Sequence, residues 1–424
     1  MSGGVHRYVY TALLYASLPL VLLRLAARGF RNADYWSRWG ERFGWVNVEP
    51  GGIWFHAVSV GEVQAAAPLI ETLLPANVLV TTMTPTGSGQ VRRLFPRGVQ
   101  HCYVPYDYPG AVRRFLNRAR PSSLVILETE IWPNIINACH RRGIKVAFAN
   151  LRLSQRSSRR YARVRGFMAS VLSQVDSFAV QGQPDSERLV ELGAPADAVH
   201  VTGSIKFEVE LPASLTEVAK VLRREWGQDR PVWIAGSTHE HEEELVLDAF
   251  RELLPSHPDL LLVLVPRHPE RFPAVAKLCR RRHLSLVRRS DGVGAVGADT
   301  RVYLGDTMGE LGLMYAASDI AFVGGSLVRG GGHNILEPCA LGVPVLFGPH
   351  MRNFLQISEM ALERGAGVQV SGVTDLVQVV DRYLGDANLR FSAGESGREL
   401  VQENRGALEK TLAVLAKLGI RPET

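Results

Sequence analysis

The stretch that decides the fold of this chain is Phe322-Val-Gly-Gly-Ser-Leu-Val-Arg-Gly-Gly-Gly-His-Asn-Ile-Leu-Glu-Pro338. It predicts an apolar strand at Ile320–Val323, then a glycine-rich turn, then a helix that begins near Asn334. Glycine lets the backbone approach a ligand closely, and the first turn of a helix offers unpaired N–H groups with a partial positive charge. A phosphate is favoured there, and Glu337 is placed to accept hydrogen bonds from sugar hydroxyls. The pattern predicts a nucleotide-sugar pocket, and its spacing favours neither a G-x-G-x-x-G dinucleotide site nor a P-loop.

Length and composition are those of a two-domain α/β enzyme. The 424 residues suit two domains of roughly 150–200 residues each. Hydrophobic residues make up 46% of the chain, with 40 Gly and 23 Pro, and this composition argues against disorder. The four cysteines are scattered without a C-x-x-C pair, so we predict neither a metal site nor a disulfide framework. A reducing cytoplasm is the simpler expectation for such a chain.

Short apolar segments alternate with helical patterns along the whole chain, which predicts parallel sheets covered on both faces. The strands predicted for the first half are Ile53–Val58, Val78–Thr81, Leu124–Leu127, Lys145–Ala149, Phe178–Val180 and Val199–Val201. Those predicted for the second half are Val232–Ala235, Leu260–Val265, Arg301–Tyr303, Ile320–Val323 and Val343–Phe347.

The domain organisation follows from this alternation. We predict an N-terminal membrane-anchoring helix at residues 1–30, a Rossmann-like domain at 31–208 and a second Rossmann-like domain at 209–386. The boundary is expected within residues 203–214. We also predict a helical run at residues 387–424, which can cross back to the first domain. Two doubly wound domains joined in this way predict a ligand cleft between the carboxyl ends of both sheets.

The uncharged segment Tyr8–Leu23 lies between Arg7 and Arg24. It is slightly shorter than the ~20 residues of a spanning helix, and it contains Pro19. A cleaved signal peptide is disfavoured, because Leu25-Ala26-Ala27 lacks the A-x-A pattern of a cleavage site. We favour an uncleaved anchor or an interfacial helix over a buried core helix. More arginines follow the segment than precede it, which places the body of the protein in the cytoplasm.

Arginine carries most of the net charge of +6. No aromatic-basic RNA motif or DNA-reading helix accompanies it, so we expect no nucleic-acid partner. Anionic lipid headgroups or a phosphorylated acceptor explain the charge better, and a merely solvated basic face is the alternative. The clusters are Arg24, Arg28, Arg31, Arg38 and Arg42, and then Arg152, Arg156, Arg159, Arg160, Arg163 and Arg165.

Three side chains of the first domain are candidates for chemistry. Glu62, in His56-Ala-Val-Ser-Val-Gly-Glu62, sits at a helix start, where it suits a general base or simply favours the helix dipole. Glu128 follows a strand and, with Glu130, has the spacing to bind a metal or orient an acceptor. Alternatively, Glu130 caps the next helix. Lys206, near the presumed hinge, either neutralises charge on a leaving group or is a solvated linker residue.

The second half offers ligand-holding groups at the ends of its strands. Arg267 follows Leu260–Val265 and suits a bidentate clamp on a phosphate. Backbone groups of Met308 and Gly309 can hold a base closely. His239 and His241 are two residues apart on a presumed helix, so they point to different faces and give only a weak metal prediction.

Together, these motifs closely resemble the 3-deoxy-D-manno-octulosonic acid (Kdo) transferases over nearly the whole chain. The motifs are His56-Ala-Val-Ser-Val-Gly-Glu62, Thr81-Thr-Met-Thr-Pro-Thr-Gly87, Glu128-Thr-Glu-Ile-Trp-Pro-Asn134, Thr202-Gly-Ser-Ile-Lys-Phe207, Val265-Pro-Arg-His-Pro-Glu-Arg-Phe272, Gly305-Asp-Thr-Met-Gly-Glu310 and the glycine-rich stretch ending at Glu337. The resemblance implies a GT-B glycosyltransferase fold at the cytoplasmic face of the bacterial inner membrane. It further implies transfer of Kdo from CMP-Kdo to lipid IVA, with inversion, in lipopolysaccharide synthesis.

The resemblance also implies a role for each matching position. Glu62 would deprotonate the acceptor hydroxyl, and Glu128 and Lys206 would stabilise the transition state. No metal and no cofactor are expected, since CMP-Kdo is a substrate. The residues that would hold CMP are Pro266, Arg267, Met308, Gly309, Glu310, Asn334, Ile335, Leu336 and Glu337. The rival predictions are a nucleotide-sugar 2-epimerase and a membrane-associated scaffold that binds nucleotides without catalysis.

Overall fold

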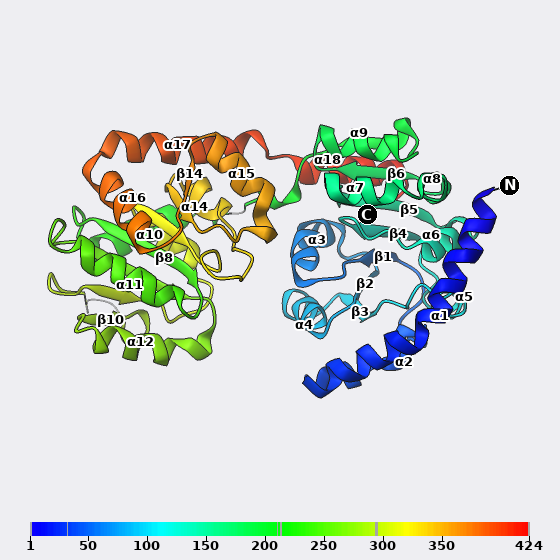
Figure 1. The fold of residues 1–424 in the computed structure, drawn as a ribbon, viewed down its shortest axis with the longest axis horizontal. Helices are drawn as coiled ribbons and strands as arrows, with labels where there is room; N and C mark the ends of the chain where they lie inside the picture. Colours follow the sequence, from blue (N-terminus) through cyan, green and yellow to red (C-terminus); the bar gives the residue numbers. More distant parts are fainter. Residues whose placement is uncertain (1, 32, 210, 213, 293–295, 423–424) are drawn as a thin grey trace. The chain divides into compact units, whose positions relative to one another are not determined.

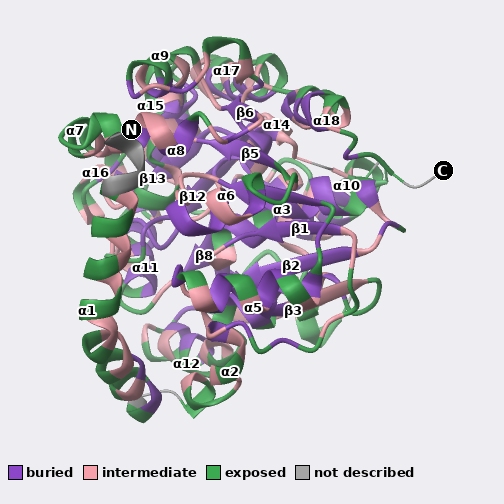
Figure 2. Ribbon diagram, turned by 90° about the vertical axis from the view of Figure 1, so that its right-hand side faces the viewer, coloured by how far each residue is buried: buried purple, intermediate pink, exposed green. Residues whose placement is uncertain are grey.

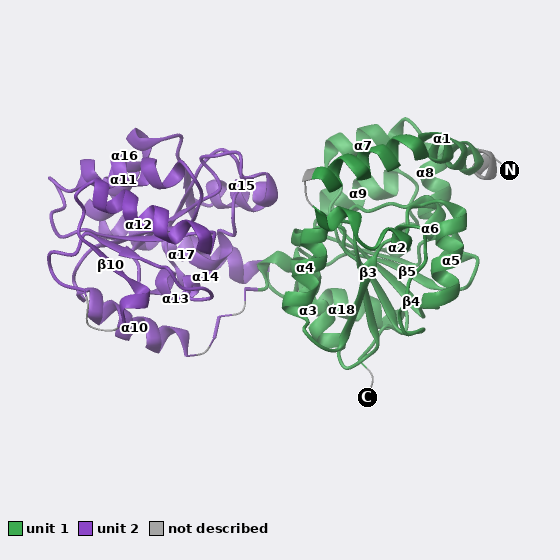
Figure 3. Cartoon of the chain, turned by 90° about the horizontal axis from the view of Figure 1, so that it is seen from below, with its two compact units in different colours: residues 1–208, 405–424 green, residues 209–404 purple. Residues whose placement is uncertain are grey.

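The computed structural model describes residues 2–31, 33–209, 211–212, 214–292 and 296–422. The chain divides into two compact units (Figure 3). Unit 1 comprises residues 1–208 and 405–424, and unit 2 comprises residues 209–404. The helical run predicted at 387–424 is therefore split between the units, because its first helix packs in unit 2 and its second in unit 1.

Unit 1 is built on a parallel sheet of seven strands within the described residues, in the order β3-β2-β1-β4-β5-β6-β7 (Figure 1). The strands are β1 (Ile53–His56), β2 (Val78–Thr82), β3 (Val99–Tyr103), β4 (Ser123–Leu127), β5 (Lys145–Leu151), β6 (Ser177–Val180) and β7 (Val199–Val201). The helices are α1 (Ser2–Arg31), α2 (Trp39–Arg42), α3 (Val60–Leu73), α4 (Pro85–Leu94), α5 (Pro109–Ala119), α6 (Pro133–His140), α7 (Gln155–Ala162), α8 (Arg165–Leu172), α9 (Gln183–Glu191) and α18 (Ala407–Lys417).

The central strands of unit 1 are buried on both faces, so most of their residues are apolar (Figure 2). In β1, Trp54 packs into the core on one face, and Ile53 and Phe55 pack into the core on the other. Helix α18 supplies Ala407 and Leu415 to that second core. The C-terminal helix is therefore a structural part of the unit that begins the chain.

Unit 2 repeats this architecture with the order β10-β11-β9-β8-β12-β13-β14, again all parallel among its described strands. The strands are β8 (Val232–Thr238), β9 (Leu261–Pro266), β10 (Leu286–Arg288), β11 (Val302–Leu304), β12 (Ile320–Val323), β13 (Val345–Phe347) and β14 (Gly367–Gln369). The helices are α10 (Leu215–Trp226), α11 (Glu242–Leu253), α12 (Phe272–Arg281), α13 (Leu311–Ala316), α14 (Leu336–Leu341), α15 (Leu355–Glu363), α16 (Val373–Gly385) and α17 (Ala387–Glu403). The predicted fold class, two parallel sheets with an apolar N-terminal helix, is confirmed.

Helix α1 lies along the outside of unit 1, against α6 and α8. Its segment His6–Phe30 is long and apolar enough to cross a membrane, and only 6% of its most apolar window is buried. On the side facing unit 1, the Tyr10 hydroxyl donates to Asp107 Oδ2 at 3.0 Å, and the ring of Tyr15 packs on that of Tyr108. The helix is not a core helix, and its apolar side chains are largely left uncovered by the protein.

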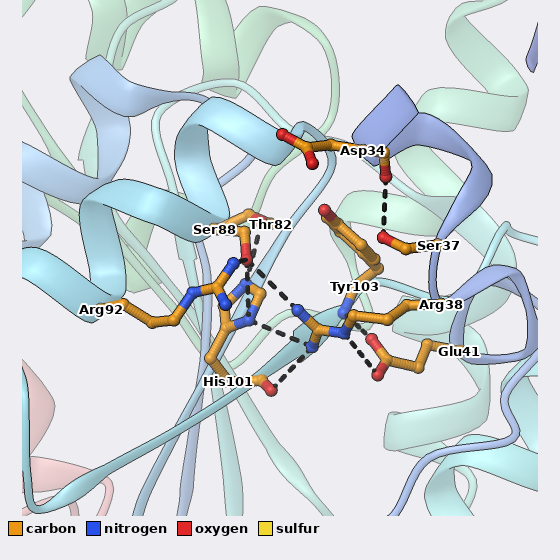
Figure 4. A network of polar contacts seen from close by, with 9 residues as sticks. All are labelled: Asp34, Ser37, Arg38, Glu41, Thr82, Ser88, Arg92, His101 and Tyr103. Carbon is orange, nitrogen blue, oxygen red and sulfur yellow. Dashed lines mark hydrogen bonds and ion pairs between the residues drawn. The ribbon is translucent and has the colours of Figure 1, made fainter. Parts of the chain in front are cut away.

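A polar network fastens the segment after α1 to one edge of the sheet (Figure 4). The Arg38 guanidinium donates to the carbonyl of His101 in β3 at 3.1 Å and to Ser88 Oγ in α4 at 3.2 Å. It also pairs with Glu41 at 2.8 Å. Arg42 is buried, with its guanidinium 4.2 Å from the centre of the Tyr103 ring. Two arginines of the first predicted surface cluster therefore serve the packing of unit 1.

Candidate functional site

The strand order of unit 1 reverses between β1 and β4, which are neighbours in the sheet. The connections after two such strands diverge, and the carboxyl ends of these strands are where open α/β sheets bind ligands. Helix α3, which carries Glu62, follows β1, and Glu128 follows β4 directly. The topology thus brings two of the three predicted catalytic residues to one place.

Glu62 is held rigidly at the first turn of α3. Its Oε2 accepts from the backbone N–H of Val58 at 2.7 Å, and its Oε1 accepts from the hydroxyl of Ser59 at 2.8 Å. Ser59 in turn is the N-cap of α3 and accepts from the Glu62 N–H at 3.4 Å. Glu62 at position N3 is thus bonded to Val58 and to the side chain of the N-cap Ser59, which stabilises the helix start and fixes the rotamer of Glu62.

Burial raises the pKa of Glu62 from its ordinary value to about 8, and the negative charge of Glu130 adds to this rise. The hydrogen bonds from Val58 and Ser59 oppose it. A carboxyl group with a pKa close to the pH of the cell accepts and releases a proton readily, which suits acid–base chemistry.

Lys206 and Glu128 form an ion pair beside Glu62. Lys206 Nζ lies 3.3 Å from Glu128 Oε1, and both side chains keep about a quarter of their surface exposed (25% and 30%). Glu128 has a φ of 55°, which is rare for a side chain other than glycine and is typical of functional sites. The three predicted catalytic residues therefore gather at the carboxyl edge of one sheet, with a cation among the carboxylates.

Glu130 does not cap the helix that follows it. Its Oε2 accepts from Trp132 Nε1 at 2.9 Å. The N-terminus of α6 is capped by buried Asp107, which accepts from the N–H groups of Asn134 at 3.0 Å and Ile135 at 2.7 Å. The capping alternative was wrong because the cap comes from a residue remote in sequence.

In unit 2 the strand order reverses between β8 and β12, so the glycine-rich turn after β12 lies at the equivalent position. The N–H groups of Gly325, Ser326 and Leu327 do point at an anion, but the anion is the buried carboxylate of Glu242. Their distances to its oxygens are 2.6, 2.9 and 2.8 Å. The protein fills this part of the turn with its own side chain, so these three N–H groups are not open to a phosphate.

The segment after the glycines is the part of the predicted pocket that carries open polar groups. Asn334 Nδ2 donates to Glu337 Oε1 at 3.3 Å, and burial raises the pKa of Glu337. Helix α14 begins at Leu336, two residues later than predicted, with Ile335 as its N-cap. The side chains of Ile335 and Leu336 are fully buried, so these two residues can offer a ligand only their backbone.

The loop after β11 is held in place by an arginine that sequence reasoning missed. Glu310 accepts two hydrogen bonds from Arg289 Nε, at 3.2 and 3.1 Å, and one from Nη2 at 2.8 Å. This pairing lowers the pKa of Glu310. Met308 is exposed, and Gly309, with a φ of 86°, has open space where a Cβ would stand. A ligand can therefore approach the backbone of this loop, while the Glu310 carboxylate is already engaged.

Three histidines and Arg267 also lie at the carboxyl edge of the unit 2 sheet. His239 follows β8, Arg267 and His268 follow β9, and His333 lies in the connection after β12. The Arg267 N–H donates to the carbonyl of Thr238 at 2.9 Å, and Pro266 ends strand β9. No group of His, Cys, Asp or Glu side chains fit for a metal ion is found among the described residues.

Comparison with known proteins identifies the family. Residues 37–209 match the family model described as 3-Deoxy-D-manno-octulosonic-acid transferase (kdotransferase). The 3-deoxy-D-manno-octulosonic acid transferase of Haemophilus influenzae is 41% identical over 418 residues, which cover 96% of this chain and 98% of that protein. The enzyme of the same name from Bordetella pertussis is 35% identical, with 96% and 98% covered.

Solved structures support the fold independently. A UDP-GlcNAc 2-epimerase from Neisseria meningitidis superposes with a TM-score of 0.54 over 86% of this chain and 99% of its own, at 15% identity. Such low identity shows the fold alone, which is the GT-B type predicted from the sequence, and the rival prediction of an epimerase gains nothing from it. On the strength of the family match and the two enzymes of the same name, the chain belongs to the family of 3-deoxy-D-manno-octulosonic acid (Kdo) transferases.

Proposed function

We propose that this Kdo transferase moves Kdo from CMP-Kdo to lipid IVA with inversion at the anomeric carbon. Unit 1 supplies the base, and unit 2 holds the cytidylate through Pro266, Arg267, the backbone of Met308 and Gly309, and the segment Asn334–Glu337. The acceptor oxygen forms the new bond to the anomeric carbon while the bond from that carbon to the phosphate oxygen breaks. The acceptor proton passes to Glu62, and the electron pair leaves with the cytidylate.

The observation that carries this proposal is the group formed by Glu62, Glu128 and Lys206 in unit 1. A fixed carboxylate with a raised pKa can take the proton, and a neighbouring cation can offset negative charge in the transition state. The ion pair with Glu128 keeps Lys206 oriented. A scaffold that only bound nucleotides would have no use for this arrangement.

The direct test is to incubate the full-length protein with CMP-Kdo and lipid IVA and to analyse the lipid by mass spectrometry. Lipid IVA carrying Kdo, together with released CMP, is the expected product. The stereochemistry of the new bond, read by NMR of the purified product, tests inversion. Release of CMP without any lipid product would overturn the choice of acceptor.

The raised pKa of Glu62 predicts the pH dependence of transfer. The base works only as the carboxylate, so kcat/KM for the acceptor, at saturating donor, should rise with pH and level off above about 8. Below that pKa, the value should fall about tenfold per pH unit. A profile that stays flat across this range contradicts the role of Glu62 as the base.

We further propose that transfer needs no metal ion. The negative charge on the departing cytidylate can be offset by Arg267, which follows β9 at the carboxyl edge of the unit 2 sheet. Treatment with EDTA, followed by assay in metal-free buffer, is expected to leave the rate unchanged. A lost rate that Mg²⁺ restores would contradict this proposal.

We propose that the protein sits at the cytoplasmic face of the inner membrane, with α1 in contact with lipid. The uncovered apolar surface of α1 and the basic surface of α7 support this, because α7 leads directly into α8, on which α1 packs. Arg156, Arg159 and Arg160 are exposed on α7. Apolar burial and attraction to anionic headgroups then act together.

Changing Arg156, Arg159 and Arg160 to glutamine should weaken binding to vesicles that contain phosphatidylglycerol by about 10²-fold, at about 1 kcal/mol for each arginine near the surface. Co-sedimentation measures the effect, which should shrink at high salt. The matched control removes the same charge from unit 2 by changing the exposed Arg251, Arg280 and Arg281. Equal losses in both variants would show that only net charge matters, contrary to the proposal.

A further inference from the structure

Two histidines of unit 2 share a short hydrogen bond. His239 Nε2 and His333 Nε2 are 2.7 Å apart, and their rings are stacked with centroids separated by 5.0 Å. The residues are far apart in sequence and lie in the connections that follow two neighbouring strands, β8 and β12, where the strand order reverses. The pair therefore lies where a sheet of this type receives its ligand.

The geometry limits the protons that the pair can carry. Two ring nitrogens this close need one proton between them, so one Nε2 donates and the other accepts. In the neutral pair, the accepting ring carries its own proton on Nδ1, while the donating ring has a bare Nδ1. One further proton fits on that bare Nδ1, and the pair then has a single positive charge. A second added proton would put hydrogens on both Nε2 atoms and break the bond.

Charged groups surround the pair on every element that packs against it. Burial is the largest effect: it lowers the pKa of His333 to about 4 and also lowers the pKa of His239. Arg267 and Arg271, which follow β9, act in the same direction, and His268 of the same segment also faces the pair. Glu242 opposes these effects at His239, but its carboxylate already accepts four backbone N–H groups. The pair is therefore neutral at neutral pH. Arg271 is already paired with Glu240 and Glu243, and the Glu337 carboxyl group interacts with Arg267.

We propose that His239 and His333 form a protonatable part of the phosphate subsite, taking up one proton when the cytidylate phosphate binds beside Arg267. This inference rests on the proposed function, since it takes CMP as the leaving group. A phosphate dianion beside Arg267 brings two further negative charges next to the pair and so favours its protonated form. The donor carries one charge on its phosphodiester and the released CMP carries two, so the pair stabilises the second charge as the bond to the sugar breaks. The proton comes from solvent, and the acceptor proton still goes to Glu62.

The test is calorimetry of CMP binding to the full-length protein in detergent, at about pH 7.5, in HEPES and in Tris. These buffers differ in ionisation enthalpy, so the difference in observed heat counts the protons exchanged. A phosphate monoester has a second pKa of about 6 and is already a dianion in this buffer, so it contributes little uptake itself. Wild-type protein should take up close to one proton per CMP, and cytidine, which lacks the phosphate, should cause none.

Two variants test whether the proton is taken up by the pair of His239 and His333. His333→Gln and His239→Gln should each still bind CMP, more weakly, with uptake reduced to near zero. His257→Gln is the control, since His257 precedes β9 at the opposite edge of the sheet and pairs with Asp381. His268→Gln is a second control, because His268 packs edge-on against His239 at 5.4 Å without sharing its proton. Both controls should retain the uptake.

The outcomes separate this inference from the proposed function. If CMP binds without proton uptake, or with an uptake that survives in both pair variants, the inference is overturned while the donor assignment stands. Uptake that disappears only in His268→Gln overturns it as well. If the wild-type protein does not bind CMP at all, the proposed donor is wrong and the inference fails with it.

Discussion

Glu62→Gln is expected to lower the rate of transfer by about 10²–10⁴-fold, the range that a general base contributes. The amide cannot accept the acceptor proton, yet it can keep both contacts that the Glu62 carboxylate makes with Val58 and Ser59. Its oxygen can still accept from the Val58 N–H, and its NH2 group can donate to Ser59, whose hydroxyl is free to turn. The helix start and the donor-binding residues of unit 2 should therefore be preserved. Initial rates with CMP-Kdo and lipid IVA measure the loss, and calorimetry with CMP measures the retained binding.

The matched control for this variant is Glu71→Gln, on the exposed side of the same helix. It removes the same charge from α3 without touching the site, so its rate should equal that of the wild-type protein. Thermal unfolding of both variants separates chemistry from folding. A Glu62→Gln protein that transfers Kdo at the normal rate would remove Glu62 from the mechanism.

The second large effect is expected from Glu242→Gln, on stability and not on chemistry. Glu242 is fully buried, and each of its oxygens accepts two N–H groups. Oε1 serves Ser326 and Leu327, and Oε2 serves His239 and Gly325. Glutamine can replace only one of these oxygens, so two N–H donors would face an NH2 group. At about 1–3 kcal/mol for each buried group left unpaired, the loss is about 2–6 kcal/mol.

Urea unfolding followed by tryptophan fluorescence should show this loss in unit 2, whose core contains Trp233. CMP binding should weaken with it, because Glu242 fixes the turn that leads to His333. Glu244→Gln, at an exposed position of the same helix, is the control and should change stability by less than about 0.5 kcal/mol. Unchanged stability in Glu242→Gln would mean that the turn is held in another way.

The sequence was a good guide to the interior of each sheet and a poor one to its edges. Strands such as β4 and β12 are buried on both faces, so their apolar runs were recognised almost to the residue. The three strands that were missed, β3, β10 and β14, all lie at the edge of a sheet. An edge strand is only partly buried and needs no continuous apolar run. Polar residues such as Gln100 in β3 and Arg288 in β10 interrupt the apolar pattern, so a search for hydrophobic runs does not detect these strands.

The same distinction applies to the candidate site: residues marked by a local sequence pattern were predicted, and contacts between residues remote in sequence were not. Residues at strand ends, such as Glu62 and Arg267, were predicted as candidates because a motif and a predicted strand lie next to each other. Contacts across the sheet were not found, because nothing local marks them. Glu242 fills a turn more than eighty positions later, and His239 has His333 as its partner, not the nearby His241. His333 lies within the glycine-rich stretch, but nothing in its distance along the sequence from His239 indicates that the two side chains are in contact.

The return of α18 to unit 1 has a practical consequence for dissecting the enzyme. A truncated chain ending at residue 208 would leave bare the apolar patch that Ala407, Leu415 and Ile420 normally cover. Such a fragment should aggregate, and a synthetic peptide spanning 405–422 should rescue its solubility. Unit 2, by contrast, is one continuous segment and can be excised whole. The backbone passes between the units twice, so a single protease nick at either passage leaves the halves tethered.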